Sequence, residues 1–227
     1  MLAERLEEVR QRIVRAGGAP GQVTVVAVTK GFGPEAVRAA VAAGITDIGE
    51  NYAQELLVKA PEVAAGLRWH FLGALQGNKL ARLAGYVHLW HGLESADQAR
   101  ALARRCPGAA VLVQVRQPPG GHPPRRGADA RDVPAVVEAA FSAGLEVRGL
   151  MALGPPGASP AEVRGAFAEV ADLARRLGLP ELSMGMSADF ELAVAEGATI
   201  VRLGQVLFGP RRPQIEPRVA HGQVASS

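Results

Sequence analysis

Cysteine is almost absent from this chain of 227 residues, since Cys106 is the only one. A single cysteine excludes both a disulfide framework within the chain and a zinc site built from cysteines. The five histidines are scattered without the spacing of metal ligands on one helix face, so we expect no metal site. We expect Cys106 to pack as a small apolar side chain at a helix end.

Aromatic residues and excess charge are also scarce. Aromatics make up 4% of the chain, and 25 basic residues against 22 acidic ones leave a net charge of +3. No basic stripe with interleaved aromatics is present, which argues against a nucleic-acid partner. No apolar run approaches the roughly 20 residues that span a bilayer, and the acidic, amphipathic first residues are unlike a signal peptide. We therefore expect a cytoplasmic protein without a membrane partner.

What the chain does contain is a regular alternation of strand-like and helix-like stretches. Strands are predicted at residues 23–29, 45–48, 67–72, 87–91, 110–115, 145–150, 181–184 and 199–203. Helices are predicted at residues 2–16, 34–43, 53–65, 79–84, 95–105, 132–143, 160–177 and 188–196. Eight such units predict an α/β fold, a single (β/α)8 TIM barrel over residues 1–209 with an extra N-terminal helix. The competing doubly wound sheet usually carries a GxGxxG turn, which residues 30–34 lack.

Two segments fall outside this repeat. Residues 117–131 form a Pro/Gly-rich loop after the fifth strand, on the side where barrels place their chemistry, and are a candidate mobile lid. Residues 210–227 are polar, with several prolines and no apolar periodicity, and are expected to be a disordered tail.

Lys30 ends the most strand-like run of the chain. A lysine at the carboxyl end of a buried parallel strand points toward the site of chemistry in α/β folds. Partial desolvation there disfavours the ammonium form, and a neutral amine is what imine formation with an aldehyde requires. The alternative is an ordinary strand-end lysine that reaches water.

The last two predicted strands end in turns suited to an anion. The turn after the seventh strand contains Ser183, Met184, Gly185 and Ser187, whose hydroxyls and backbone N–H groups could face a phosphate, although such a turn also serves as a plain helix cap. Arg202 and Gly204 end the eighth strand, and barrels commonly build a phosphate site at these two loops. An imine-forming lysine facing a phosphate cradle fits pyridoxal 5′-phosphate (PLP), which carries an aldehyde and a phosphate.

Several motifs, in order, resemble the pyridoxal phosphate homeostasis proteins (the YggS/PROSC family) over about residues 5–210. The motifs are Val28-Thr29-Lys30, residues 49–55 (GENYAQE), residues 69–79 (WHFLGALQGNK), residues 148–152 (RGLMA), residues 182–189 (LSMGMSAD), residues 201–204 (VRLG) and Phe208-Gly209. The resemblance implies the barrel of the alanine racemase N-terminal domain. It also implies a monomer that buffers PLP or delivers it to PLP-dependent apoenzymes without strong catalysis of its own.

The resemblance further assigns roles to residues. It implies an aldimine at Lys30, phosphate contacts from the turn 183–187 and from Gly204, and Asn51 beside the ring. Arg202 would face the pyridine nitrogen and keep it unprotonated, which makes the ring a poor electron sink. Lys79, in the loop after the third strand, is a second candidate attachment point. We interpret His70 as a packed side chain and assign no role to His88 or His91.

Two alternatives and two departures from the family pattern stay open. A weak fold-type III amino-acid racemase would need a second base, which alanine racemase takes from a C-terminal domain; this chain ends after the barrel and has only Tyr52 and Tyr86 as tyrosines. A cofactor-free imine-forming enzyme of the class I aldolase kind is the other alternative. Arg116 stands where the family has asparagine and is expected to reach solvent, and Gln205 stands where Ser or Thr is common.

Overall fold

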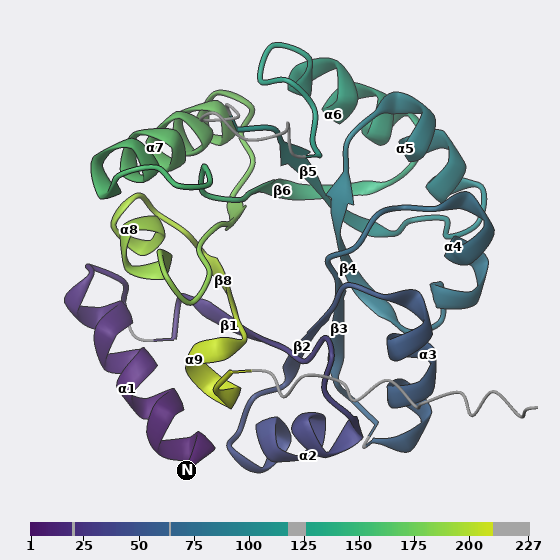
Figure 1. Cartoon of the computed structure of the whole chain (residues 1–227). Coiled ribbons are helices and arrows are strands. Elements are labelled where there is room, and N and C mark those ends of the chain that lie inside the picture. Colours follow the sequence, from purple (N-terminus) through teal and green to yellow (C-terminus); the bar gives the residue numbers. More distant parts are fainter. Residues whose placement is uncertain (20, 64, 118–125, 211–227) are drawn as a thin grey trace, which may run out of the picture.

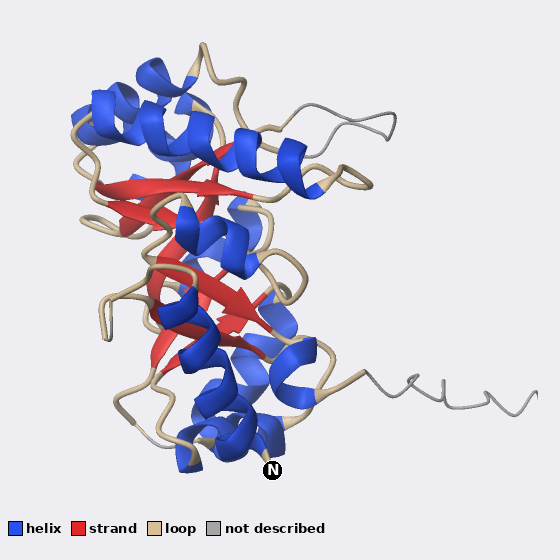
Figure 2. Ribbon diagram, turned by 90° about the vertical axis from the view of Figure 1, so that its left-hand side faces the viewer, coloured by secondary structure: helices blue, strands red, loops and turns tan. Residues whose placement is uncertain are grey.

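Eight parallel strands close into a barrel in sequence order, with the helices outside it (Figures 1 and 2). The computed structural model describes residues 1–19, 21–63, 65–117 and 126–210. The strands are β1 (Thr24–Val28), β2 (Asp47–Glu50), β3 (Arg68–Phe71), β4 (Val87–Leu93), β5 (Ala110–Val115), β6 (Glu146–Ala152), β7 (Glu181–Ser183) and β8 (Ile200–Leu203). The predicted (β/α)8 barrel is confirmed.

The helices follow the strands around the barrel. They are α1 (Leu2–Arg15), α2 (Pro34–Ala42), α3 (Ala53–Glu62), α4 (Gly77–Leu83), α5 (Ala96–Ala103), α6 (Val133–Ser142), α7 (Pro160–Arg176), α8 (Phe190–Ala195) and α9 (Gln205–Phe208). No helix among the described residues has the length and apolarity to cross a bilayer. Most of the predicted lid, residues 118–125, and all of the predicted tail after Pro210 lie outside the described residues.

The extra N-terminal helix packs beside the last two helices of the barrel (Figure 1). Leu6, Val9 and Ile13 repeat at helical spacing on α1 and are all buried. Arg12 adds a two-pronged ion pair to Glu191 of α8, with N–O distances of 3.0 and 2.8 Å. Helix α1 therefore covers the seam where the end of the chain returns to its beginning.

The barrel interior is small and separate from the main core. Because strand side chains alternate between two faces, Val26, Leu89, Leu112, Met151 and Ile200 form one buried cluster inside the barrel. Their neighbours along the strands face outward and pack against the helices in a much larger cluster. Some interior positions are polar, and these positions connect to the functional site.

Two differences from the sequence prediction lie near the site: one strand is shifted along the chain and one short helix was not predicted. Strand β2 was expected at residues 45–48 but runs from Asp47 to Glu50, because Glu50 is fully buried and neutralised by Lys59. A carboxylate at that position resembles a loop residue when only the sequence is considered. The four-residue helix α9 was not predicted, and it follows directly after Gly204.

The contact between β6 and β7 predicts a strong effect at Gly149. An added Cβ would lie 1.8 Å from the backbone oxygen of Glu181 on the neighbouring strand, so Gly149→Ala must force the strands apart. We expect urea denaturation to show a loss of about 3 kcal/mol in the free energy of unfolding, the upper end of overpacking costs. As a control, Gly165→Ala on α7 meets nothing within 4 Å and should raise stability by about 0.5–1 kcal/mol. Equal stability of Gly149→Ala and wild type would contradict the strand spacing described.

Candidate functional site

A cavity of about 860 Å³ opens at the carboxyl-terminal rim of the barrel. Its size suits a small-molecule ligand. Five residues singled out from the sequence line it together, namely Lys30, Asn51, Ser187, Arg202 and Gly204. They come from strand ends that are far apart in the sequence and that barrel closure brings to one rim.

The charge of the cavity has one sign. Its described lining contains four basic side chains, Lys30, Lys79, Arg126 and Arg202, and no aspartate or glutamate. The amide oxygen of Asn51 is buried in the same region without a hydrogen-bond partner among the described residues. A buried orphan acceptor and four cations fit a ligand that carries negative charge and at least one donor.

Three of the predicted binding residues lie behind the cavity wall. Ser183, Met184 and Gly185 do not line the cavity, and Ser183 and Met184 are fully buried. Gly185 has φ +89°, and a Cβ there would lie 2.7 Å from the Cα of Phe190, so this tight turn requires glycine. The next residues of the turn, 186–188, form the wall instead.

A buried ion-pair network lies under the β1 end. The Nζ of Lys59, on α3, donates to Glu50 Oε1 at 2.6 Å, to Glu55 Oε2 at 2.7 Å and to the backbone oxygen of Thr29 at 2.8 Å. The Thr29 hydroxyl also donates to Glu50 Oε1 at 2.5 Å. Burial raises the pKa of Glu50, and the hydrogen bonds from Lys59 and Thr29 oppose that rise. Three donors of Lys59 are therefore used to hold the backbone and two carboxylates together.

This network fixes the backbone on both sides of Lys30. Thr29 is held through its carbonyl and hydroxyl, and the Gly31 N–H donates to Glu55 Oε2 at 2.8 Å. Gly31 has φ +76°, a conformation that glycine adopts without a steric penalty. The half-buried Lys30 therefore projects into the cavity from a backbone that is anchored before and after it. Sequence reasoning identified Lys30 but not this support.

Arg202 is the most buried cation of the cavity. Its Nη1 donates to the backbone oxygen of Ser183 at 2.6 Å and to the Ser183 hydroxyl at 2.5 Å, and its Nη2 donates to the backbone oxygen of Ala152 at 2.8 Å. Burial lowers the pKa of Arg202 to about 10, so the guanidinium stays charged at neutral pH. Two of its five N–H groups have no acceptor among the described residues and are available to a ligand.

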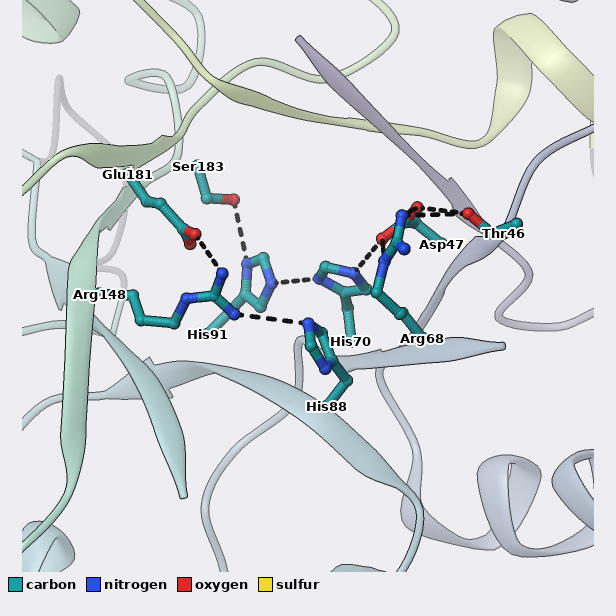
Figure 3. Close-up of polar contacts among 9 residues, drawn as sticks. All are labelled: Thr46, Asp47, Arg68, His70, His88, His91, Arg148, Glu181 and Ser183. Atoms are coloured by element: carbon teal, nitrogen blue, oxygen red, sulfur yellow. Dashed lines mark hydrogen bonds and ion pairs between the residues drawn. The ribbon is translucent and has the colours of Figure 1, made fainter. Parts of the chain in front are cut away.

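Two histidines that sequence reasoning left without a role contact this region. His91 was given no function, yet it is fully buried and its Nδ1 lies 3.0 Å from the Ser183 hydroxyl. His70, interpreted as a packed side chain, is buried as expected but also lies 2.9 Å from His91 (Figure 3). Nothing in their spacing could have indicated this contact, because β3, β4 and β7 meet only in the closed barrel.

The remaining expectations have mixed outcomes. Arg116 is exposed and binds the backbone oxygen of Gly127, so the expectation that it reaches solvent is confirmed. Gln205 and Lys79 line the cavity, and Tyr52 lies at it with a 57% exposed side chain. Cys106 is buried as expected. Within the described ranges no cluster of histidine, cysteine and carboxylate side chains is suited to a metal ion.

Comparison with known proteins places this cavity in a family. Residues 2–212 match the model of the alanine racemase, N-terminal domain. The chain is 43% identical over 208 residues to a protein of Deinococcus radiodurans, covering 89% of this chain and 97% of the relative. It is 39% identical over 218 residues to one of Pseudomonas aeruginosa, covering 92% and 94%. Both relatives carry the name pyridoxal phosphate homeostasis protein.

Solved structures agree with this placement. PipY of Synechococcus elongatus with PLP bound superposes with a TM-score of 0.83 at 35% identity, covering 92% of this chain and all of that one. An alanine racemase of Clostridium difficile superposes at 0.68 with 13% identity, covering 93% of this chain and 58% of that one, which indicates a shared fold alone. The chain therefore belongs to the family of the pyridoxal phosphate homeostasis proteins, built on the barrel of the alanine racemase N-terminal domain.

Proposed function

We propose that this protein binds pyridoxal 5′-phosphate at the carboxyl-terminal cavity, with Lys30 as the covalent attachment point, and serves intracellular PLP homeostasis. It would work in the cytoplasm as a monomer that buffers the cofactor or delivers it to PLP-dependent apoenzymes. The observation that carries the proposal is the cavity itself, whose described lining brings Lys30 together with Asn51, Ser187, Arg202 and Gly204 at one rim of the barrel. The PLP-bound structure of PipY and the names of the relatives support it.

The residues present fit the cofactor. When bound, PLP supplies an aldehyde carbon that forms a reversible imine with an amine. Ser187, Gly204 and Gln205 line the cavity between the β7 and β8 loops and would hold the phosphate. The buried Asn51 oxygen, which has no partner among the described residues, would accept a hydrogen bond from the ligand. Ser183, Met184 and Gly185 do not line the cavity and would act indirectly. They shape the turn that forms the cavity wall, and Ser183 binds Arg202.

Arg202 sets the electronic character of the site. An arginine donates hydrogen bonds and does not take part in proton exchange near neutral pH, because its pKa of about 10 keeps it charged. A ring nitrogen facing it must therefore act as an acceptor and stay unprotonated. Such a ring stabilises a carbanion poorly, which suits holding the cofactor more than transforming an amino acid.

A weak racemase is the second candidate function, and the fold shared with alanine racemase is the observation that favours it. Racemisation needs a second base on the opposite face of the substrate. Tyr52 lines the cavity but is 57% exposed, so the protein does not hold it as a buried, oriented base would be held. We therefore keep racemisation as a side activity at most. No particular observation favours a cofactor-free aldolase-like reaction.

The attachment point has a direct test, since the chain contains only three lysines, Lys30, Lys59 and Lys79. Incubation with PLP, reduction with borohydride and peptide mass mapping should place the label on Lys30. We expect Lys30→Ala to lose the near-visible absorption band and the label, because the amine of Lys59 at the β1 end is buried in ion pairs and does not line the cavity.

Two matched variants sharpen this test. Lys30→Arg keeps the charge but has no amine that forms a stable imine, so it should also remain unlabelled. Lys79→Arg keeps the second cavity lysine's charge and should leave the Lys30 label in place. Retention of the full label by Lys30→Ala after desalting would contradict the proposal.

The absence of strong catalysis predicts slow exchange at the amino-acid α-carbon. In deuterated water, the PLP-loaded protein should exchange the α-proton of alanine or serine no faster than free PLP does, as judged by NMR. A known alanine racemase, loaded with the same amount of PLP and measured in the same way, provides the positive reference for the exchange rate. Steady exchange well above the rate of free PLP would make the racemase the better description.

The network beneath Lys30 predicts a stability effect. Lys59→Met leaves the buried Glu50 and its neighbour Glu55 without their cation, and breaking a buried pair in this way costs about 3–5 kcal/mol. Urea denaturation should show this loss. Adding Glu50→Gln removes the uncompensated charge and should recover a large part of it. A Lys59→Met variant as stable as wild type would show that the network does not anchor the β1 end.

A further inference from the structure

A chain of five buried polar side chains crosses the barrel interior from one end to the other. Asp47, His70, His91, Ser183 and Arg202, which we call the interior relay, are each at most 5% exposed. Asp47 lines a second cavity at the amino-terminal end, together with Thr46 and Arg68, whereas Arg202 lines the carboxyl-terminal cavity. Figure 3 shows the part of the relay from Asp47 to Ser183.

Consecutive members of the relay are within hydrogen-bond distance. Asp47 Oδ1 lies 3.0 Å from His70 Nε2, and His70 Nδ1 lies 2.9 Å from His91 Nε2. His91 Nδ1 lies 3.0 Å from Ser183 Oγ, which lies 2.5 Å from Arg202 Nη1. Both ring nitrogens of both histidines are therefore used. The five members come from five different strands, β2, β3, β4, β7 and β8.

The two end residues of the relay determine the direction in which its hydrogen bonds are donated. Burial alone would favour the neutral acid at Asp47, but hydrogen bonds from His70 and Arg68 outweigh it and hold the pKa of Asp47 well below its usual range. Thr46 and Arg68 occupy the remaining acceptor positions of this carboxylate, at 2.5 to 2.9 Å. Asp47 can therefore only accept from His70, and at the other end Arg202 can only donate.

These two ends assign both tautomers. A neutral His70 that donates from Nε2 must accept at Nδ1, so His91 donates from its Nε2. Burial lowers the pKa of His91 well below its ordinary value, so this ring is neutral, and its Nδ1 accepts from the Ser183 hydroxyl. The Ser183 oxygen then accepts from Arg202. Every donor of the relay points from Arg202 toward Asp47.

This direction helps a buried arginine to remain charged without a direct carboxylate partner, in addition to the charge of Asp189, which also opposes the lowering of its pKa. The partners of Arg202 within the described residues are neutral oxygens of Ser183 and Ala152. Each imidazole turns its acceptor nitrogen toward the cation and its N–H toward the anion. Aligned in this way, the ring dipoles stabilise Arg202 at one end and Asp47 at the other.

We propose that His91 and His70 are positioning residues, which hold the Ser183 hydroxyl as an acceptor and thereby orient the guanidinium of Arg202 toward the carboxyl-terminal cavity. With Nη1 engaged by Ser183 and Nη2 by Ala152, the two N–H groups without a described acceptor have one fixed direction. Loss of the relay frees the Ser183 hydroxyl and leaves the arginine with fewer constraints. Only the ligand-binding part of the test below rests on the proposed function.

Hydrogen-bond donation in the opposite direction, from Asp47 toward Arg202, would place the protons differently. It needs a protonated His70 that donates from Nδ1 to His91, whose own Nδ1–H then faces Ser183. The Ser183 hydrogen would have no acceptor among the described residues, and a second cation would be buried near Arg202. Arg68, His88, Arg148 and Glu181 are the other charged or titratable groups near His70, and of these Arg148 binds Glu181 and His88 instead of the relay (Figure 3).

The first measurement needs no ligand. Nitrogen-15 NMR of the histidine rings in the full chain at neutral pH should show His70 and His91 both neutral, with the proton on Nε2. Assignment follows from the loss of single signals in His70→Gln and His91→Asn. A proton on Nδ1 of His91, or a doubly protonated His70, would overturn the proposed direction whether or not the protein binds PLP.

The second measurement is the affinity for PLP by absorbance titration. His91→Leu fills the space but breaks the relay, and we expect roughly tenfold weaker binding, the effect of one lost hydrogen bond in a charged network. His91→Asn places an acceptor near the Nδ1 position and should recover part of the affinity. His88→Leu, on the same strand but outside the relay, should bind like wild type.

The NMR measurement and the PLP titration together distinguish a failure of this proposal from a failure of the proposed function. Wild-type affinity in a folded His91→Leu variant, with folding checked by urea denaturation, would overturn the positioning role. Failure of the wild-type protein itself to bind PLP would contradict the proposed function, whereas the tautomers measured by NMR would still decide the direction of the relay.

Discussion

Pairing of β1 with β8 is the constraint on which the site depends. The register sets Val26 opposite Arg202 and Ala27 opposite Leu203, and this pairing closes the sheet. Lys30 and Gly204, which lie at opposite ends of the sequence, then emerge from adjacent strands at the same rim. Helix α1 packs over this seam against α8 and α9, so the first and last elements secure the closure (Figure 1). A one-residue slip would turn Arg202 out of the barrel interior.

The protein buries two cations near the site, and it neutralises them differently. Lys59 has direct carboxylate partners in Glu50 and Glu55, and all three lie outside the cavity. The direct hydrogen-bond partners of Arg202 are neutral oxygens, the charge of Asp189 acts on it without a direct ion pair, and the proposed relay adds oriented side chains that end at Asp47. The difference follows from position. A carboxylate beside Arg202 would sit in the cavity wall and repel an anionic ligand, whereas one beneath Lys30 does not face the ligand.

The sequence predicts the parts of this site that depend on local pattern. Apolar runs in a repeat of strands and helices located the eight strands, and Lys30, Ser187, Arg202 and Gly204 follow from strand ends, whereas Asn51 was implied by the family resemblance. Buried charge is what local pattern misses. Glu50 and Lys59 resemble solvated residues until α3 folds onto β2, which is why the β2 boundary was misplaced. His91 gains its role only from Ser183, 92 positions away. Ser183 itself was expected in the cavity because a serine in a turn resembles an anion contact, but strand alternation turns its hydroxyl toward Arg202.

The interactions that hold a ligand here also limit the chemistry done on it. The cavity lining carries four basic side chains, of which Arg126 is paired with Glu94, and this positive charge attracts an anionic aldehyde, while the buried Arg202 offers only donors. In the function proposed, a ring nitrogen that faces this arginine stays unprotonated, so bonds at the attached carbon are weakly activated. An imine at Lys30 would form from the neutral amine and the aldehyde with release of water, and would break by hydrolysis, so neither direction needs that activation. The same relay that steadies Arg202 therefore separates reversible binding from catalysis, and it does so without removing any part of the racemase-like barrel.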